Sequence, residues 1–554
     1  MSARVYPSRL LESCPGPPPW PVRARAGRAP APRVGGVTDQ GLALVLLGAA
    51  AVATAGVCRW RGISPALPLL VVGLALSFVP GLVGQVPDPE QVLVFLLAPL
   101  VFALALETSY LDLRSASRPI LVLAVGLVVV TTLVIGGAIS TIDGRVPLAV
   151  ACVLGAVLAP TDAVAASTVG RKAGLPRRVL TIIEGESLVN DGTALTLLRV
   201  ALAAVAAGSV TVGQVAWTLT LSVVVGAGLG ALVGALVSFL LSRVDDQVVG
   251  NAAILVTPFA VYLGAERFGG SGLLGVVVAG VWISHAGSTR AQAEVRLTSS
   301  VLWGEFAFLL ESVAFLFVGL ELLSTVESMT QLTWVGFIAS TLVVVVILLV
   351  TRALFILGVR MITPRAQRVG WRTSVVIVWA GTRGPISALA AFSVPVVLDD
   401  GTAFPGRSAI LAVTFGVIVV TLLLSLTLGP LVRRLGFEEE DDAEVVAEAR
   451  DRAAEAGLAR LDELVDAARA DGEEVPERLV SGLRGAVMVR RHIATRSHRM
   501  TEVYLDWRRE MLDAERAELH DMRDSGRLPD PVMRDLLHEI DRREATLNSD
   551  RPSA

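Results

Sequence analysis

The stretch from Ile182 to Leu198, IIEGESLVNDGTALTLL, places three carboxylates inside what otherwise reads as one apolar helix. The three acidic residues are Glu184, Glu186 and Asp191. A carboxylate at the centre of a membrane costs about 2.5–3.5 kcal/mol on insertion scales, so it should face a partner, water or a substrate. Glu184 lies close enough to the helix end to act as an end residue, but no structural role requires Asp191.

A narrow stripe of this helix carries its polar groups. Ser187, Asn190 and Asp191 recur at i, i+3 and i+4 and share one face, and Glu186 lies one residue away. A carboxylate surrounded by hydroxyl and carbonyl oxygens can hold either a proton or a dehydrated alkali cation, because these cations prefer hard oxygen ligands. We therefore expect Asp191 to take part in transport.

Two other apolar stretches contain helix breakers beside charged residues. In AVLAPTDAVAASTV, Pro160 precedes Thr161 and Asp162, and in VVIVWAGTRGPISALAAF, Pro385 closely follows Arg383. Proline removes a backbone donor, and open backbone at membrane depth is tolerated only where it lines a cavity or is buried in protein. Two interrupted helices in corresponding positions indicate an inverted-repeat transporter with its site at the midplane. Ordinary kinks in membrane helices are the alternative.

The other ionisable residues in apolar runs suggest an ion pair. Arg352, in LLVTRALFI, and Arg383 need anionic partners, and Glu186 and Glu107 are available. A pair of Glu186 with Arg352 would remove one carboxylate from the transport site. Glu311 interrupts a further apolar run, FLLESVAFLFVGLEL, and receives no role from its pattern.

The elements that must position these residues are membrane-spanning helices. The chain has 554 residues, is 53% hydrophobic and has a mean hydropathy of +0.64. Apolar runs of about 20 residues, long enough to cross a ~30 Å hydrocarbon core, follow one another. We expect an all-α polytopic membrane protein with thirteen spans, at 41–58, 65–83, 91–111, 119–140, 147–169, 179–207, 213–241, 248–265, 271–286, 301–323, 333–358, 373–398 and 408–431.

Charged loops and termini predict the domain organisation and the orientation. Residues 1–40 are rich in proline and arginine and form a disordered segment or a mis-assigned start, 41–435 form the transmembrane domain, and 436–554 form a charged helical tail. The basic residues of the loops lie mostly on one side of the membrane, which the positive-inside rule places in the cytoplasm together with the tail. They are Arg59, Arg61, Arg114, Arg118, Arg171, Lys172, Arg177, Arg178, Arg243, Arg290, Arg296, Arg360, Arg365, Arg368, Arg372, Arg433 and Arg434.

Three motifs, APTDAVA, GESLVNDGTAL and GTRGPISALA, resemble in order and spacing the monovalent cation/proton antiporter family of bacterial NhaP-type antiporters and animal sodium/proton exchangers. The resemblance covers about residues 41–432. It implies a thirteen-helix fold with a core domain and a dimerisation domain, in which helices five and twelve are discontinuous, and a homodimer in the cell membrane.

The resemblance also implies roles for single residues. Asp191, preceded by Asn190, matches the shared carrier of cation and proton. Thr161, Asp162 and Ser187 match residues around the bound cation and, with Asp191, would ligate it. Glu186 with Arg352 resembles a structural ion pair, and Arg383 resembles the arginine of helix twelve. Glu107 is the nearest match, with a small shift, to an acid on the third helix.

These observations predict exchange of monovalent cations for protons, without a cofactor and with no nucleic acid as partner. Because Asn190 is neutral, the expected exchange is electroneutral, one cation for one proton. The residue types leave Na⁺, K⁺ and Li⁺ open, since coordination geometry decides that choice. A K⁺-selective antiporter, a gated cation channel, and an intramembrane enzyme with Ser187 as nucleophile are the alternatives. The enzyme would need a general base, and the only histidine in a span is His285, near its end.

Overall fold

The computed structural model describes residues 37–79, 91, 93–208, 211–244, 246–290, 293–327, 333–364, 369–398, 401–437, 442–471, 475–495, 498–525 and 527–549. The predicted N-terminal segment 1–40 lies outside these residues, except for the last four, which begin the first helix. The chain divides into two compact units, Met1–Phe437 and Glu438–Ala554.

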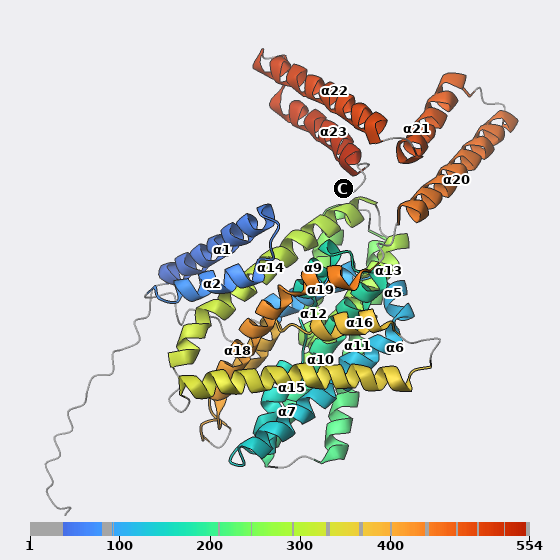
Figure 1. Ribbon diagram of the computed structural model, residues 1–554. Helices are drawn as coiled ribbons and strands as arrows, with labels where there is room; N and C mark the ends of the chain where they lie inside the picture. The colour runs from blue at the N-terminus through green and yellow to red at the C-terminus, as the bar shows by residue number, and fades with distance from the viewer. Residues whose placement is uncertain are drawn as a thin grey trace, which may run out of the picture. The chain divides into compact units, whose positions relative to one another are not determined.

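Helices make up the first unit (Figure 1). They are α1 Val37–Trp60, α2 Ala66–Leu76, η1 Leu93–Leu97, α4 Ala98–Glu107, α5 Tyr110–Ser115, α6 Ser117–Leu121, η2 Val122–Leu127, α7 Val128–Ile142, α8 Leu148–Leu158, α9 Ala163–Lys172, α10 Arg177–Ala207, α11 Val212–Leu241, α12 Gln247–Arg267, α13 Gly272–Arg290, α14 Ala293–Glu327, α15 Trp334–Ile362, α16 Trp371–Trp379, α17 Pro385–Phe392, α18 Arg407–Ser425 and α19 Leu428–Leu435. The predicted all-helical class is confirmed for the part of the chain that the structure describes.

Seven described helices are long and apolar enough to cross a membrane: Ser117–Ile142, Arg177–Ala207, Gly213–Leu241, Gln247–Arg267, Thr298–Leu323, Trp334–Ile362 and Arg407–Leu435. Shorter apolar helices lie at Val45–Trp60, Ala66–Leu76, Leu93–Glu107, Leu148–Leu158 and Gly272–Ala286. Each of these helices overlaps one of the predicted spans.

Polar residues at the loops define where several helices begin. Thr211 forms a capping box with Gln214 at the start of α11, and the Asp246 carboxylate accepts from two backbone N–H groups at the start of α12. Thr333 caps α15 in the same way through the N–H of Gly336. Such caps satisfy N–H groups that have no partner within the helix, and they fix the helix ends at the edges of the apolar runs.

Two interruptions of the helical backbone lie where the sequence contains its breakers. Helix α8 ends at Leu158 and α9 begins at Ala163, with residues 159–162 non-helical between them. Helix α16 ends at Trp379 and α17 begins at Pro385, with residues 380–384 between them. Helix α10 packs against α8 and α9 and also contacts α16 and α17, so its polar stripe lies beside both interruptions.

The second unit contains four helices, α20 Asp442–Ala470, α21 Glu477–Thr495, α22 His498–Asp524 and α23 Asp530–Ser549, which pack as α20 on α21 and α22 on α23. Arg516 joins α22 to α23 through ion pairs with Glu544 and with Asp541 at 2.7 Å. These carboxylates, Glu544 above all, raise the pKa of Arg516 above its ordinary value. The second unit is thus a set of charged helices within the region of the predicted tail.

Candidate functional site

The two backbone interruptions contact one another directly. The N–H of Asp162 donates to the carbonyl oxygen of Thr382 at 2.8 Å. The Thr382 hydroxyl donates in return to the carbonyl oxygen of Asp162 at 2.9 Å. The N–H of Arg383 is satisfied by the Thr421 hydroxyl on α18 at 3.1 Å. Backbone groups that leave a helix in an apolar interior need such partners, and here each break supplies them to the other.

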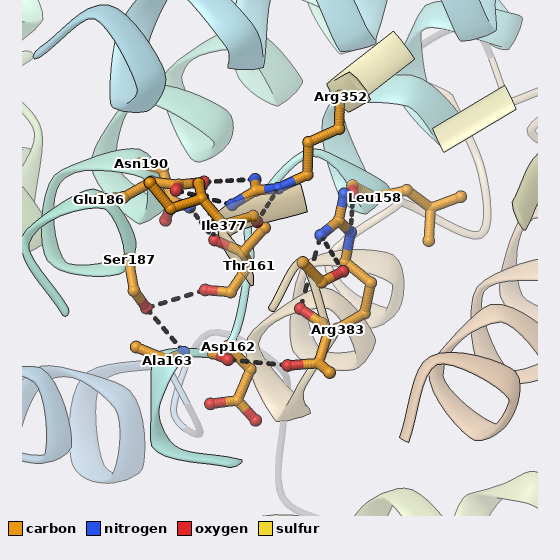
Figure 2. A network of polar contacts seen from close by, with 12 residues as sticks. Leu158, Thr161, Asp162, Ala163, Glu186, Ser187, Asn190, Arg352, Ile377 and Arg383 are labelled. Carbon is orange, nitrogen blue, oxygen red and sulfur yellow. Dashed lines mark hydrogen bonds and ion pairs between the residues drawn. The ribbon is translucent and has the colours of Figure 1, made fainter. Parts of the chain in front are cut away.

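Helix α10 holds the first interruption through its polar stripe (Figure 2). The Ser187 hydroxyl donates to the carbonyl oxygen of Thr161 at 2.8 Å and accepts from the N–H of Ala163 at 3.3 Å. The Asn190 amide donates to the Thr161 hydroxyl at 2.8 Å. These bonds fix the position of the loop that carries Asp162.

A buried ion pair joins α10 to α15, as the sequence predicts for Glu186 and Arg352. The Arg352 guanidinium donates to both Glu186 oxygens, at 2.5 and 2.8 Å, and through Nε to the carbonyl oxygen of Ile377 on α16 at 2.8 Å. The Thr161 hydroxyl donates to the same carboxylate at 3.2 Å. Arg352 and Glu186 are only 3% and 2% exposed. Both oxygens of Glu186 are thus engaged in hydrogen bonds.

The sequence predicts an anionic partner for Arg383, but the structure places backbone carbonyl oxygens around its guanidinium. Its guanidinium donates to the carbonyl oxygens of Leu158 at 2.5 Å and Gly381 at 2.8 Å, and within the described part of the chain it forms no ion pair with a carboxylate. Leu158 is the last residue of α8, where unsatisfied carbonyls carry partial negative charge. The open ends of the broken helices therefore take the place of an acidic partner.

Two glycines of the GTRGP segment allow the close approach of the polar groups. A Cβ at Gly384 would lie 2.5 Å from Asp162 Oδ2, and a Cβ at Gly381 would lie 2.9 Å from Cδ of Arg352. Neither position leaves room for a methyl group without moving its neighbour. The second interruption thus has glycine where the Asp162 carboxylate and the Arg352 side chain pack against backbone.

A cavity of about 660 Å³ lies beside this network and is lined by Thr161, Asp162, Ser187, Asp191, Glu311 and Ser387, among other residues. Asp191 is 2% exposed, and its Oδ1 has no hydrogen-bond partner among the described residues. A buried carboxylate oxygen without a partner is costly unless a proton or a cation satisfies it. The arrangement suits a site that binds one or the other.

The structure does not bring every predicted residue to this cavity. The Asn190 side chain is fully buried, donates to Thr161 and is not part of the cavity lining. Glu107 ends α4 and lines the same cavity, but it is exposed, whereas Asp191 is buried. Glu107 thus lies on the solvent-accessible side of the cavity, together with Glu184, which pairs with Arg171 at 2.5 Å.

The amino-acid sequence matches a known protein family. The profile described as sodium/hydrogen exchanger, transmembrane, matches residues 46–434. The chain belongs to the transmembrane sodium/hydrogen exchanger family. The predicted resemblance to cation/proton antiporters is thereby confirmed, and the family consists of transporters rather than enzymes.

Several relatives of this exchanger have names that state a transport activity. An uncharacterised Na⁺/H⁺ exchanger of Mycobacterium tuberculosis is 31% identical over 526 residues, 91% of this chain and 95% of that protein. A sodium, potassium, lithium and rubidium/H⁺ antiporter of Bacillus pumilus is 32% identical over 391 residues, 66% of this chain and 57% of that protein.

The exchanger fold is also similar to a solved structure. The sodium proton antiporter MjNhaP1 from Methanocaldococcus jannaschii, solved at pH 8, superposes with a TM-score of 0.59 and 19% sequence identity, over 72% of this chain and all of that one. At this identity the likeness concerns the fold, and the site has to be argued from the residues of this exchanger.

Glu311 and Ser387 line the cavity and are not part of the predicted site. Glu311 on α14 is a further carboxylate of the cavity lining, besides Asp162 and Asp191. Its signal in the sequence was an acid in the middle of a long apolar run. Ser387 is 1% exposed, and its Oγ has no hydrogen-bond partner among the described residues. A serine in an apolar helix gives no such signal, because serine commonly bonds to its own helix.

Proposed function

We propose that this exchanger transports monovalent cations in one direction and protons in the other, with Asp191 as the group that binds both. The observation that carries the proposal is the contrast between two buried acids on one helix. Glu186 has both oxygens occupied by Arg352, whereas Asp191 lines the cavity and its Oδ1 lacks a partner within the described residues. Only Asp191 has the capacity to exchange one ligand for another.

Competition at this carboxylate couples the two fluxes. A protonated Asp191 is neutral and far less costly to bury, while a deprotonated Asp191 needs a cation in the cavity to balance its charge. Thr161, Asp162 and Ser187, which line the same cavity, provide the oxygen atoms that alkali cations prefer, and they make up the proposed cation site with Asp191. Since the two states exclude one another, neither ion can be carried with the other.

Movement of the broken helices would expose this site alternately to each side of the membrane. We take α8 with α9, and α16 with α17, as the discontinuous helices five and twelve of a thirteen-helix inverted-repeat fold. Their reciprocal hydrogen bonds between Asp162 and Thr382 support movement of both as one body. The likeness to the MjNhaP1 fold supports the same architecture.

The stoichiometry follows from the charges near the site. The Glu186–Arg352 pair is neutral as a unit, and Asn190 adds no charge beside Asp191. If Asp191 alone exchanges its ligand, and Asp162 and Glu311 in the same cavity keep their charge through the cycle, one H⁺ is exchanged for one monovalent cation and the exchange is electroneutral. The ion that is exchanged is Na⁺ in this proposal. A broader selectivity that includes K⁺ is the second candidate, supported by the name of the Bacillus pumilus relative.

The setting of this activity is a membrane with the charged tail on the cytoplasmic side. The distribution of loop arginines supports this orientation, and the cell membrane is the expected location. A homodimer is expected from the family resemblance. In this setting the tail unit, Glu438–Ala554, would be accessible to cytoplasmic regulators.

Exchange in proteoliposomes tests the proposal. With an imposed pH gradient and a fluorescent pH reporter, addition of Na⁺ should collapse the gradient for the wild type but not for Asp191→Asn. The same assay with Li⁺ and K⁺ tests the broader selectivity. Glu305→Gln is the matched control, because Glu305 is an exposed acid on α14 outside the cavity lining. Gradient collapse by Asp191→Asn at the wild-type rate would overturn the assignment, and cation conductance without proton movement would indicate a channel.

A further inference from the structure

A second cavity, of about 770 Å³, lies between α6, η2, α10, α15 and α16 and shares no lining residue with the transport cavity. Arg114, Arg118, Arg178 and Arg360 line it, and its described lining contains no acidic residue. We refer to it as the arginine cavity. The transport mechanism gives none of these arginines a role.

Within the described residues these arginines form no ion pairs. Arg114, Arg118 and Arg178 are exposed and form no ion pair with a carboxylate of the described chain. Arg360 donates to the carbonyl oxygen of Val369 and likewise forms no ion pair with a described carboxylate. Four guanidinium groups around one cavity repel one another, and an anion that accepts from several of them relieves that repulsion. The planar guanidinium fits the oxygens of a phosphate group especially well.

The deeper wall of the arginine cavity is apolar. It is formed by the buried side chains of Leu123, Ile182, Ile356 and Ile377, which belong to the same helices as the arginines or to their neighbours. Three of the helices around it, Ser117–Ile142, Arg177–Ala207 and Trp334–Ile362, are long and apolar enough to cross a membrane. The cavity therefore combines cationic groups at the helix ends with an apolar surface along the helix flanks, as the headgroup and the upper acyl chain of a phospholipid require.

We propose that the arginine cavity binds an anionic phospholipid, whose phosphate contacts Arg118 and Arg178 and whose acyl chain lies against the isoleucine wall. A free phosphate ion shares the headgroup chemistry, but it would leave the apolar wall unused. A zwitterionic phospholipid shares the acyl chain, but it brings a cationic group to a site that already holds four arginines.

The bound lipid would brace the helices that hold the Glu186–Arg352 pair. Ile182 lies one turn before Glu186 on α10, and Ile356 lies one turn after Arg352 on α15. The carbonyl of Ile377, a third residue of the wall, accepts from Arg352 at 2.8 Å. Lipid in the cavity thus contacts all three helices that meet at the ion pair, and its binding to the folded state stabilises their arrangement.

Thermal unfolding of the purified full-length protein in detergent tests this proposal. Phosphatidylglycerol should raise the Tm by at least about 2 °C, while phosphatidylcholine and inorganic phosphate should each leave it nearly unchanged. The double variant Arg118→Gln/Arg178→Gln should lose the response to phosphatidylglycerol. Native mass spectrometry provides an independent readout, with one phosphatidylglycerol retained per wild-type chain and none in the double variant.

The matched control removes the same charge from the same predicted face. Arg59 and Arg243 each lie over an aromatic ring, of Phe308 and Phe239, and neither lines the arginine cavity. Arg59→Gln/Arg243→Gln should keep both the Tm response and the bound lipid. An equal response in both double variants would overturn the proposal, because the lipid would then bind by overall charge. An equal rise with inorganic phosphate would identify a soluble anion as the ligand and overturn the lipid assignment.

Discussion

Asp162 and Thr382, 220 residues apart in the chain, exchange two hydrogen bonds, one from backbone to backbone at 2.8 Å and one from hydroxyl to backbone at 2.9 Å. Each residue lies in a non-helical segment between two short helices. Without the other, each segment would leave buried polar backbone groups unsatisfied, which is costly in an apolar interior. The two interruptions therefore depend on each other, and a change at one should affect the other.

Removal of the Thr382 hydroxyl should weaken this link. Thr382→Val keeps the shape of the side chain but deprives the Asp162 carbonyl of its hydroxyl donor, at a cost of about 1–3 kcal/mol for an unsatisfied buried group. We expect a lower Tm and slower exchange. Thr141→Val is the control, because the exposed Thr141 hydroxyl bonds only to its own helix and should change neither value. Equal effects of the two substitutions would argue against a special role for the link.

A methyl group at Gly384 should disturb the cation site. Its Cβ would lie 2.5 Å from Asp162 Oδ2, so the carboxylate has to move. Overpacking of this kind costs about 1–3 kcal/mol, or roughly a 5- to 150-fold loss of affinity if the cost falls on the cation-bound state. We expect Gly384→Ala to raise the Na⁺ concentration for half-maximal exchange. Gly228→Ala, where the added Cβ meets no atom within 4 Å, should leave it unchanged.

The Glu186–Arg352 pair should be far more sensitive to the loss of one partner than to the loss of both. Arg352→Leu leaves a buried, unpaired carboxylate and should destabilise the fold by about 3–5 kcal/mol, whereas Glu186→Gln/Arg352→Leu should be milder than the sum of the single changes. Unfolding measurements on the four members of the cycle give the coupling energy. The more exposed pair of Arg171 with Glu184 is the comparison, with an expected coupling of about 0–1 kcal/mol. Similar couplings for both pairs would contradict the buried, structural role of Glu186.

Exchange should be independent of the membrane potential. If Asp191 carries either one proton or one monovalent cation, each cycle moves no net charge. Proteoliposomes in which a gradient of the membrane-permeant cation tetraphenylphosphonium sets the potential, without a K⁺ gradient, should show the same rate of Na⁺-driven proton movement at zero, positive and negative potential. A rate that follows the potential would show that further charge moves with the ions.

The sequence predicts which residues of this site are chemically active better than it predicts the groups to which those residues bond. Helix breakers and acids in apolar runs are visible without a structure, because hydrocarbon tolerates them only for a reason, and Asp191, Asp162 and Glu186 were identified in this way. The partner of Arg383 could not be predicted, since backbone carbonyls at the end of α8 carry no side-chain signal. The absence of Asn190 from the cavity lining could not be predicted either. Residues on one helical stripe still point in directions that differ by tens of degrees.

Glu311 shows a further limit of reasoning from the sequence. Its position in an apolar run was apparent, but its neighbours Asp162 and Asp191 lie on segments far away in the chain. The packing that brings Glu311 of α14 to the same cavity as Asp191 of α10 involves the whole first unit, and no periodicity within a single helix determines that packing.

The central claim is that one carboxylate, Asp191, binds either the proton or the cation, and proton release on cation binding tests it most directly. In weakly buffered detergent solution near the apparent pKa of the site, Na⁺ should release protons from the wild-type protein but none from Asp191→Asn. The Na⁺ concentration for half-maximal release should rise about tenfold for each unit of pH below that value. Proton release by Asp191→Asn equal to that of the wild type, or a half-maximal concentration that does not change with pH, would contradict the account.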